Sequence, residues 1–290
     1  MTEQEQNKIK GLRAELAKVK ASRDKHKARL VELDRAQSIL VASNDALYDL
    51  FTHHVRPQFP TSLPTAELSN HISYRGRELS NPGDRWLMSG FICAVQLKKL
   101  LNQQLPDFKP RTVLDFGCGS ARTTRYLPLL GEGIDLHGCD IDETAISWLH
   151  SRPDVTGHFF HVTDTPPLPA GLPKYDLILA QSVFTHLPEE LEQRWLTELS
   201  KAINPGGIIV ATYHGRSFQR FIPADQSAGF ESSGFAYATI HPTPGLPDFY
   251  QTSFHTEEYI RARWSAYGNI VAALEHGLEG QDVAIIQSRS

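Results

Sequence analysis

Cysteine is scarce in this sequence, with three residues among 290. The surrounding patterns place Cys93 in a helix, Cys118 in a loop and Cys139 in a strand. An odd number of scattered cysteines does not make a disulfide framework. We therefore expect free thiols and a reducing, cytoplasmic setting.

The chain also has no long apolar run and no surplus of positive charge. No apolar stretch approaches the roughly 20 residues that a membrane-spanning helix needs, and the polar N-terminus has no apolar signal-peptide core. The formal net charge is -4 at pH 7, whereas a general nucleic-acid binder carries a basic face. We expect no membrane span and no general nucleic-acid binding.

The first 52 residues differ in pattern from the rest of the chain. Apolar residues recur there at heptad spacing, which is typical of a coiled coil. Polar residues interrupt the seam at Arg23, His26, Gln37 and Asn44, so the number of helices in the coil is not specified. We expect a coiled-coil helix over residues 1–52 that forms a homo-oligomer or docks a partner, with a single solvated helix as the alternative. The heptad residues are Ile9, Leu16 and Leu30 in one series and Leu12, Val19, Leu33, Leu40 and Leu47 in the other.

A loop-like segment is expected over residues 53–84, on the substrate side of the domain that follows. Its prolines break regular structure. An amphipathic helix is predicted next, from Arg85 to Gln104. The prolines are Pro57, Pro60, Pro64 and Pro82, and the inward-facing helix residues are expected to be Trp86, Phe91, Val95, Leu97 and Leu101.

From residue 85 to residue 290, strand and helix patterns alternate. Such alternation predicts an α/β domain with a doubly wound, mostly parallel sheet covered by helices on both faces. The last two strand patterns are separated only by GLEGQ, which is too short for a crossover, so the last strand should be antiparallel. The seven strand patterns are RTVLDFG, IDLHGCDI, HFFHVT, YDLILAQS, IIVATYH, NIVAALEH and DVAIIQS, with helices expected at ARTTRYLPLL, ETAISWLH and before Pro205-Gly206-Gly207.

A glycine loop follows the first of these strands, in VLDFGCGSARTTRYL. Gly117 and Gly119 leave room for a ligand against the backbone. A dinucleotide fingerprint would have a third glycine where Arg122 stands, and a Walker loop would need Gly-Lys-Ser/Thr, so both phosphate interpretations are disfavoured. Asp140 ends the second strand and can accept hydrogen bonds from both ribose hydroxyls, while Asp142 suits a helix cap.

Together these motifs resemble those of class I S-adenosylmethionine-dependent methyltransferases. Asp115-Phe-Gly117-Cys-Gly119-Ser-Ala121 is similar to motif I of that family, and Cys139-Asp140 is similar to its ribose motif. YDLILAQSVFTHL, LSKAINPGGIIVAT and the terminal hairpin resemble its later motifs. The resemblance implies a Rossmann-like methyltransferase fold and S-adenosyl-L-methionine as cofactor. Ala121 departs from the pattern, because a third glycine is usual there, and cofactor affinity would suffer if it crowds the loop.

The resemblance also implies a role for each matching position. The backbone of Gly117 and Gly119, with Asp115 nearby, would hold the methionine part of the cofactor. Asp140 would bind the ribose. The remaining cofactor-binding positions that it implies are Ile141 after the ribose motif, Thr163 and Asp164 at the adenine, and Gln181 and Ser182 at the sulfonium centre.

A general base is needed only where the methyl acceptor is a protonated group such as a hydroxyl. His186, in SVFTHLP, lies just beyond the fourth strand and is the first candidate, with ordering of the loop as its alternative role. His214 and His255 are weaker candidates. A metal site is not expected, because the pairs His137/Cys139 and His158/His161 each lack a second pair of ligands in the sequence.

Residues from about 215 to 255 form an insertion before the last hairpin. Its interleaved aromatic residues and prolines are typical of a binding loop or lid, and equally of a small local core. We expect a methyltransferase acting on a small molecule or a saccharide, through a hydroxyl. The alternatives are N-methylation of a metabolite and a non-catalytic, cofactor-binding scaffold that acts through the coiled coil. The aromatic residues of the insertion are Phe218, Phe221, Phe230, Phe235, Tyr237, Phe249 and Tyr250.

Overall fold

The structure is a computed structural model that describes residues 48–64, 82–239 and 247–289. The chain divides into two compact units, one ending at Pro57 and the other beginning at Gln58. In the first unit the described elements are η1 (Phe51–Val55), a π-helical turn, and the start of η2 (Arg56–Gln58), a 3-10 turn. The predicted coiled coil falls almost wholly on residues 1–47, which lie outside the described residues.

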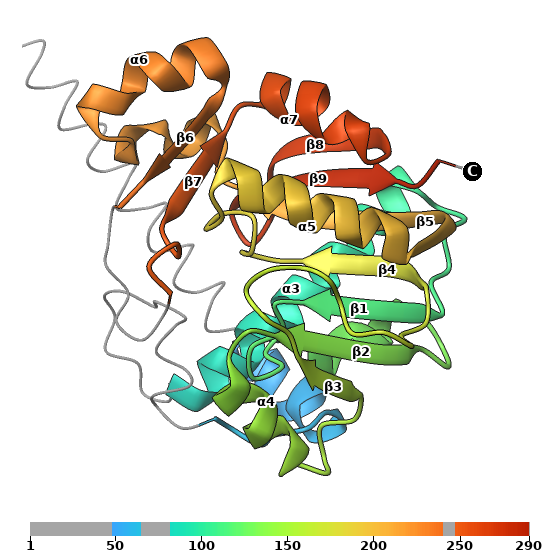
Figure 1. Cartoon of the computed structure of the whole chain (residues 1–290). Helices are drawn as coiled ribbons and strands as arrows, with labels where there is room; N and C mark the ends of the chain where they lie inside the picture. Colours follow the sequence, from blue (N-terminus) through green and yellow to red (C-terminus); the bar gives the residue numbers. More distant parts are fainter. Residues whose placement is uncertain (1–47, 65–81, 240–246, 290) are drawn as a thin grey trace, which may run out of the picture. The chain divides into compact units, whose positions relative to one another are not determined.

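The second unit is built on a seven-stranded sheet in the order β3-β2-β1-β4-β5-β9-β8. All pairs from β3 to β5 are parallel, and β9 is antiparallel to both of its neighbours. Figure 1 shows this, since the arrowheads of β1, β2 and β4 point one way and that of β9 the other. The predicted mostly parallel sheet with an antiparallel last strand is confirmed. The strands are β1 (Thr112–Phe116), β2 (Asp135–Asp140), β3 (His158–His161), β4 (Tyr175–Ala180), β5 (Ile203–Tyr213), β8 (Asn269–Leu278) and β9 (Gln281–Gln287).

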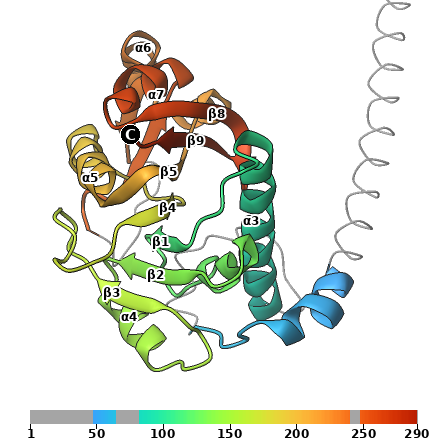
Figure 2. The same cartoon turned by 90° about the vertical axis from the view of Figure 1, so that its right-hand side faces the viewer.

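Helices cover both faces of this sheet, as the alternating pattern predicts. Figure 2 shows α3 (Pro82–Gln104) on one face and α5 (Glu189–Ala202) on the other. Successive strand residues point to opposite faces, so Leu114 packs with the α5 side while Val113 packs with the α3 side. The central strands β1 and β4 therefore carry apolar residues on both faces, as expected for a sheet covered on both sides.

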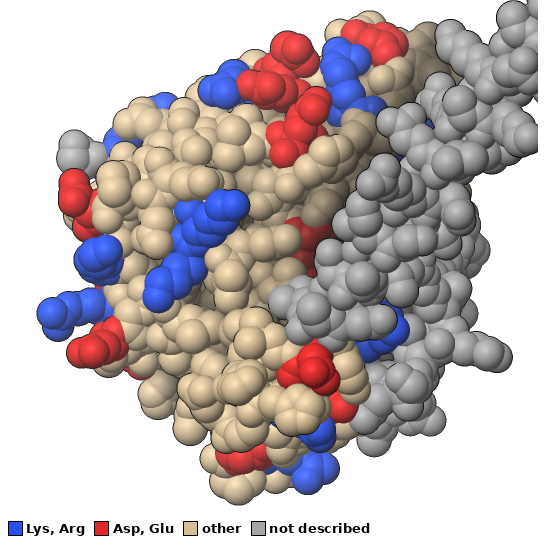
Figure 3. Space-filling model, turned by 180° about the vertical axis from the view of Figure 1, so that it is seen from behind, with Lys and Arg blue, Asp and Glu red and all other residues tan. Residues whose placement is uncertain are grey.

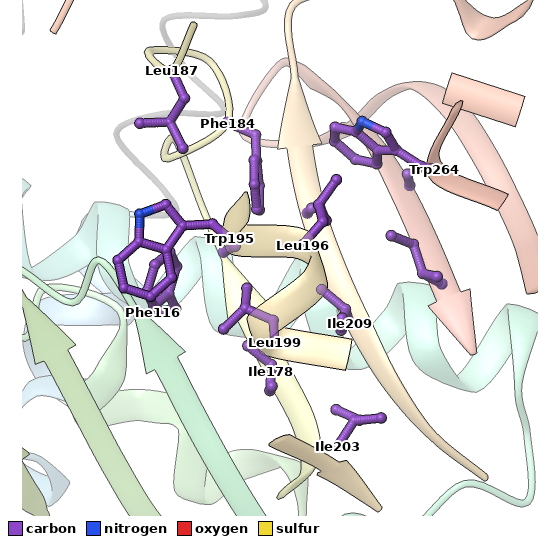
Figure 4. Packing of buried hydrophobic residues seen from close by; sticks show 14 of the residues in the cluster. Phe116, Ile178, Phe184, Leu187, Trp195, Leu196, Leu199, Ile203, Ile209 and Trp264 are labelled. Carbon is purple, nitrogen blue, oxygen red and sulfur yellow. The ribbon is translucent and has the colours of Figure 1, made fainter. Parts of the chain in front are cut away.

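The α5 face holds the larger hydrophobic cluster (Figure 4). Pro188 is the N-cap of α5, and three glutamates occupy the first turn of the helix, where the positive end of the helix dipole favours negative charge. Trp195 lies against Phe116 of β1, with ring centroids 4.8 Å apart. Leu196 and Leu199 are fully buried on the same side of the helix. One apolar stripe thus fixes α5 on the sheet.

Three details of the sequence prediction are wrong. The helix expected to run up to Pro205-Gly206-Gly207 ends at Ala202, and β5 begins at Ile203 and continues through these three residues. Val95 in α3 is 44% exposed and does not face inward. The segment ARTTRYLPLL contains a 3-10 helix, η3 (Thr124–Leu130), rather than an α-helix, since Pro128 within it cannot donate a backbone hydrogen bond.

The insertion forms a small substructure of its own. The antiparallel pair β6 (Phe235–Ala238) and β7 (Thr252–His255) is joined to η4 (Arg216–Phe221) and α6 (Ala224–Ser233) by a local apolar core. In Figure 1 it lies on the side of the sheet to which the arrowheads of the parallel strands point. The local-core interpretation holds for this part, whose core consists of Ile222, Phe230, Ala236 and Phe254, with Phe218 packed against it.

The remaining elements connect these layers. They are α4 (Glu143–His150), α7 (Glu257–Arg263) and η5 (Trp264–Ala266). No helix among the described residues has the length and apolarity to cross a membrane. On the face seen in Figure 3, Lys and Arg side chains of the described residues are interspersed with Asp and Glu rather than gathered into one basic surface.

Candidate functional site

The glycine loop lies at the carboxyl end of β1, beside the point where strand order reverses between β1 and β4. In open α/β sheets ligands bind at such a reversal. The loop closes over the end of β2, because the N–H groups of Gly117 and Cys118 both donate to the Cys139 carbonyl, at 2.8 and 3.0 Å. The backbone of the loop is thus held at the edge where a ligand would bind.

The two glycines of the loop meet different surroundings. Both have positive φ, +85° at Gly117 and +52° at Gly119. A Cβ on Gly117 would lie 2.4 Å from Cγ2 of Val183, so the protein itself requires glycine there. A Cβ on Gly119 would have no atom of the described residues within 4 Å. Gly119 therefore opens onto free space into which a ligand group can approach the backbone.

Asp140 lies at the carboxyl end of β2, next to this space. Its carboxylate accepts hydrogen bonds from the N–H groups of Gly119, at 2.7 Å, and of Asp142, at 2.9 Å. One bond falls on each oxygen, so each oxygen keeps a further acceptor position. Burial raises the pKa of Asp140, while the two backbone N–H groups act in the opposite direction. The arrangement suits two neighbouring hydroxyl donors such as those of a ribose.

Asp142 caps the following helix, as its position suggested. It accepts from the N–H groups of Thr144 and Ala145, at 2.9 and 3.1 Å. Only Asp140 of this pair is therefore left for a ligand.

Asp115 is buried beneath the loop. Its carboxylate accepts a 2.6 Å hydrogen bond from the hydroxyl of Thr124. Burial raises the pKa of Asp115 to about 6, although the Thr124 hydrogen bond and the charge of Arg122 lower it. Asp115 is 3% exposed, and at pH 7, about one pH unit above this pKa, its carboxylate is mostly ionised.

Ala121, the departure from the family pattern, takes a left-handed conformation with φ +61°. A residue with a Cβ is strained there by about 1–2 kcal/mol. Its methyl group is fully buried in a cluster with Cys118 and with Ile146 and Leu149 of α4. The alanine is thus accommodated by packing, and the strain explains why glycine is usual at this position.

Gln181 and Ser182 are held by a network that the sequence did not reveal. The side-chain nitrogen of Gln181 donates to Glu279, and its oxygen accepts from the Thr123 hydroxyl at 2.9 Å and from the Cys93 thiol at 3.1 Å. Glu279 lies in the tight turn between β8 and β9, with φ +49°.

Glu279 is held in turn by the residue after Ala121. Arg122 binds it through two nitrogens, at 2.9 and 2.8 Å. The turn thereby joins the glycine loop to the end of β4. Ser182 is fixed in the same way, because its hydroxyl donates to Gln281 of β9 at 3.0 Å. No short-range sequence signal connects positions more than 150 residues apart.

The other expected cofactor residues lie at neighbouring strand ends. Thr163 and Asp164 are exposed after β3. The Thr163 hydroxyl donates to the Thr165 carbonyl at 2.7 Å, and the Asp164 carbonyl accepts from Trp195 at 3.0 Å. Ile141 is half-buried, and its carbonyl lies 3.2 Å from Nε2 of His161. Their contact with a cofactor stays a prediction.

His186 follows the carboxyl end of β4 and faces the insertion. Its Nδ1 lies 2.6 Å from the carbonyl oxygen of Gln251. A carbonyl oxygen only accepts, so Nδ1 carries the proton and Nε2 carries the lone pair. Nε2 has no hydrogen-bond partner within the part of the chain that the structure describes. Burial lowers the pKa of His186 to about 4, so the ring is neutral at pH 7.

Tyr250 stacks on the His186 ring, with centroids 4.0 Å apart and an interplanar angle of 15°. Its pKa is raised by burial and additionally by the negative charge of Asp140. Tyr250 is therefore within electrostatic reach of the carboxylate that faces the glycine loop. The stacked pair connects the insertion to the candidate cofactor site.

His214 and His255 occupy different positions. The Nδ1 atom of His214 lies 3.2 Å from the Ser253 carbonyl, and burial lowers the pKa of His214 to about 3. His214 packs against Phe218 of the insertion, with centroids 4.5 Å apart. His255 is fully buried, with Nε2 2.6 Å from Glu192. Without solvent access it cannot reach a substrate, and we assign it a structural role.

Residues 114–209 match the family model described as a methyltransferase domain. The chain carries a class I S-adenosylmethionine-dependent methyltransferase domain. CalS10 from Micromonospora echinaspora, described as an amino pentose methyltransferase, is a similar solved structure, with 13% identity and a TM-score of 0.50 over 73% of this chain and 99% of that one. Magnesium protoporphyrin IX methyltransferase from Synechocystis PCC 6803 gives 16% identity and a TM-score of 0.49 over 85% and 100%. At these identities the likeness concerns the fold.

The residues of this methyltransferase fit its cofactor, S-adenosyl-L-methionine. The open backbone at Gly119 offers room for the methionine part, and the free acceptor positions of Asp140 offer partners for the ribose hydroxyls. When bound, the cofactor supplies a methyl group activated by the sulfonium charge. The protein residues position it and exclude water.

Replacing Gly119 with alanine is expected to lower cofactor affinity by at least about tenfold, because the new methyl group would occupy the open space. The φ of +52° also adds about 1–2 kcal/mol of strain, which lowers stability with or without the cofactor. Gly133→Ala is a matched control, since Gly133 has φ +67° and equally open surroundings but lies in the turn before β2. Calorimetry with S-adenosylmethionine measures the loss of cofactor affinity, and thermal unfolding measures the loss of stability that backbone strain causes. Both variants should lose similar stability. Equal cofactor affinities of the two variants would contradict a cofactor site at Gly119.

Proposed function

We propose that this methyltransferase transfers a methyl group to a hydroxyl of a small molecule or saccharide, with His186 as the general base. The observation that supports this is the orientation of the His186 ring. Nδ1–H is fixed on the Gln251 carbonyl, so the lone pair of Nε2 is presented without a partner among the described residues. A hydroxyl must lose its proton during methylation, and an oriented neutral imidazole can accept it.

His186 is favoured over His214 by its neighbours. Tyr250, which senses the charge of Asp140, stacks on His186. His214 instead packs against Phe218 and Phe254, which belong to the local core of the insertion. We therefore propose that the acceptor hydroxyl lies beside His186.

The test is product analysis with the purified full chain. S-adenosylmethionine is supplied with a panel of sugars, amino sugars and small alcohols and amines, and S-adenosylhomocysteine is measured. Amino sugars are included because CalS10 is described as an amino pentose methyltransferase. An O-methylated product supports the proposal. A product methylated only on nitrogen contradicts it, and a chain that binds the cofactor but methylates no acceptor would instead be a scaffold.

The pH dependence of the rate should report the buried base. Since burial lowers the pKa of His186 to about 4, kcat at saturating cofactor and acceptor is expected to be flat between about pH 6 and 8 and to fall as pH drops through about 4. His214 and Tyr250 are the titratable groups that contact the ring.

Both histidines also affect stability in the same pH range. Their folded pKa values lie below the unfolded value of about 6.5, so the stability they contribute is complete above pH 6.5 and is lost as pH falls towards their folded values of about 4 and 3. Rates should therefore be checked for recovery after return to neutral pH. An inflection near pH 6.5 in the recovered rates would argue against His186 as the base.

A further inference from the structure

Three potential metal ligands meet at the amino end of β2. Asp135 and His137 are two residues apart on β2, so their side chains share one face of the sheet. His158, the first residue of β3, is the register partner of His137. The ligand atoms of the three side chains all lie within 4.8 Å of one another.

The separations match the coordination shell of a small transition-metal ion. Oδ1 of Asp135 lies 3.3 Å from Nε2 of His137 and 3.7 Å from Nε2 of His158. Tetrahedral ligands about 2.0–2.1 Å from Zn²⁺ are about 3.4 Å from one another. The side chains are therefore already close to a shared position for the ion.

The second nitrogen of His137 has a partner of the kind that metal-bound imidazoles use. Its Nδ1 lies 3.3 Å from the hydroxyl of Tyr175, which is fully buried in β4. If Nδ1–H donates to this oxygen, Nε2 keeps its lone pair for an ion. His137 is itself buried, with 7% of its surface exposed, while His158 and Asp135 are open to solvent. An ion can thus enter from solvent and reach one fixed ligand and two adjustable ones.

We propose that Asp135, His137 and His158 bind Zn²⁺ or a similar divalent ion, with water completing the shell. Two imidazoles and one carboxylate are a common zinc donor set. Asp140 lies five positions beyond Asp135 on β2, about 16 Å away at the rise of a strand, so the ion would not touch the reacting atoms. It would tie β3, a four-residue strand that pairs with β2 alone among the described strands, to the rest of the sheet.

The site depends on strand register, which explains why the sequence did not predict it. His137/Cys139 and His158/His161 each lack a second ligand pair along the chain, and only the pairing of β2 with β3 brings one member of each together. Without an ion, the same carboxylate would merely lie between two imidazoles. The experiment must distinguish a site that binds an ion from a carboxylate that only contacts two imidazoles.

The test is Zn²⁺ titration of the chelator-treated full chain by calorimetry, with Co²⁺ absorption as a report of tetrahedral geometry. Asp135→Asn and His158→Ala are expected to weaken Zn²⁺ binding by at least about tenfold. Both side chains are exposed, so neither change should prevent folding. His161→Ala is the matched control, since His161 is an exposed histidine on the same strand.

Thermal unfolding supplies a second readout. Zn²⁺ should raise the melting temperature of the parent chain and of His161→Ala but not that of His158→Ala, because an ion that binds only the folded state stabilises it. Cofactor affinity should be the same with and without Zn²⁺. The proposal is overturned if His158→Ala and Asp135→Asn bind Zn²⁺ as tightly as the parent, or if His161→Ala loses as much affinity as they do.

Discussion

Replacing His186 with alanine is expected to lower kcat by about 10²–10⁴-fold while leaving cofactor affinity nearly unchanged. General-base catalysis contributes an effect of this size, and the cofactor residues at the glycine loop and Asp140 do not contact the ring through any hydrogen bond that the described residues show. The measurement is steady-state turnover with an acceptor from the panel, together with calorimetry for the cofactor.

The conservative variant separates catalysis from loop ordering. In His186→Asn, the side-chain amide can still donate to the Gln251 carbonyl, which is the one hydrogen bond that the His186 side chain makes in the described structure. Asparagine has no basic nitrogen, so the His186→Asn variant should be as inactive as His186→Ala. Turnover restored by asparagine would mean that His186 only orders the loop. If turnover is lost in His214→Ala but not in the His186 variants, His214 is the general base.

Replacing Glu192 with alanine is expected to reduce the free energy of unfolding by about 3–5 kcal/mol. Glu192 lies in α5 with no exposed surface. Its carboxylate lies 2.6 Å from Nε2 of His255, and accepts from Nε1 of Trp264 at 2.7 Å and from the Tyr259 hydroxyl at 3.4 Å. Removing it leaves the buried nitrogens of His255 and Trp264 without this partner, beside a His255 Nδ1 that already has none among the described residues.

Glu190→Ala is the matched control for this change. Glu190 lies in the same first turn of α5 but is exposed, so its loss should cost under about 1 kcal/mol. Denaturant unfolding of both variants gives the comparison. Thermal midpoints should separate by roughly 10 °C for a domain of this size. Equal midpoints would mean that the buried carboxylate is not needed for stability.

Glu192 also links stability to the candidate site. His255, its partner, is on β7, and the backbone N–H of His255 donates to the carbonyl of His214 at 2.9 Å. The neighbouring Ser253 carbonyl lies against Nδ1 of His214. The buried network therefore holds the insertion against the carboxyl ends of the sheet, where His186 and His214 lie.

The sequence by itself determined the fold, and its resemblance to class I methyltransferases implied the cofactor. Apolar strands in alternation with amphipathic helices leave few arrangements besides a parallel sheet covered on both faces, and GLEGQ is long enough only for a hairpin. Gly117, Gly119 and Asp140 follow strand ends, and strand ends of a parallel sheet gather at one edge. These signals are local in the chain, so they can be recognised from the sequence alone.

Only the tertiary structure decided which side chains act together. Arg122 and Glu279 are 157 residues apart, and their ion pair depends on how the β8–β9 turn meets the glycine loop. The three candidate histidines look alike in the sequence. In the structure His255 is fully buried with its Nε2 against Glu192, whereas Nε2 of His186 has no partner among the described residues. His137 and His158 meet only through strand register. Contacts of this kind depend on packing between elements that are distant in the chain, so the local periodicity of the sequence does not predict them.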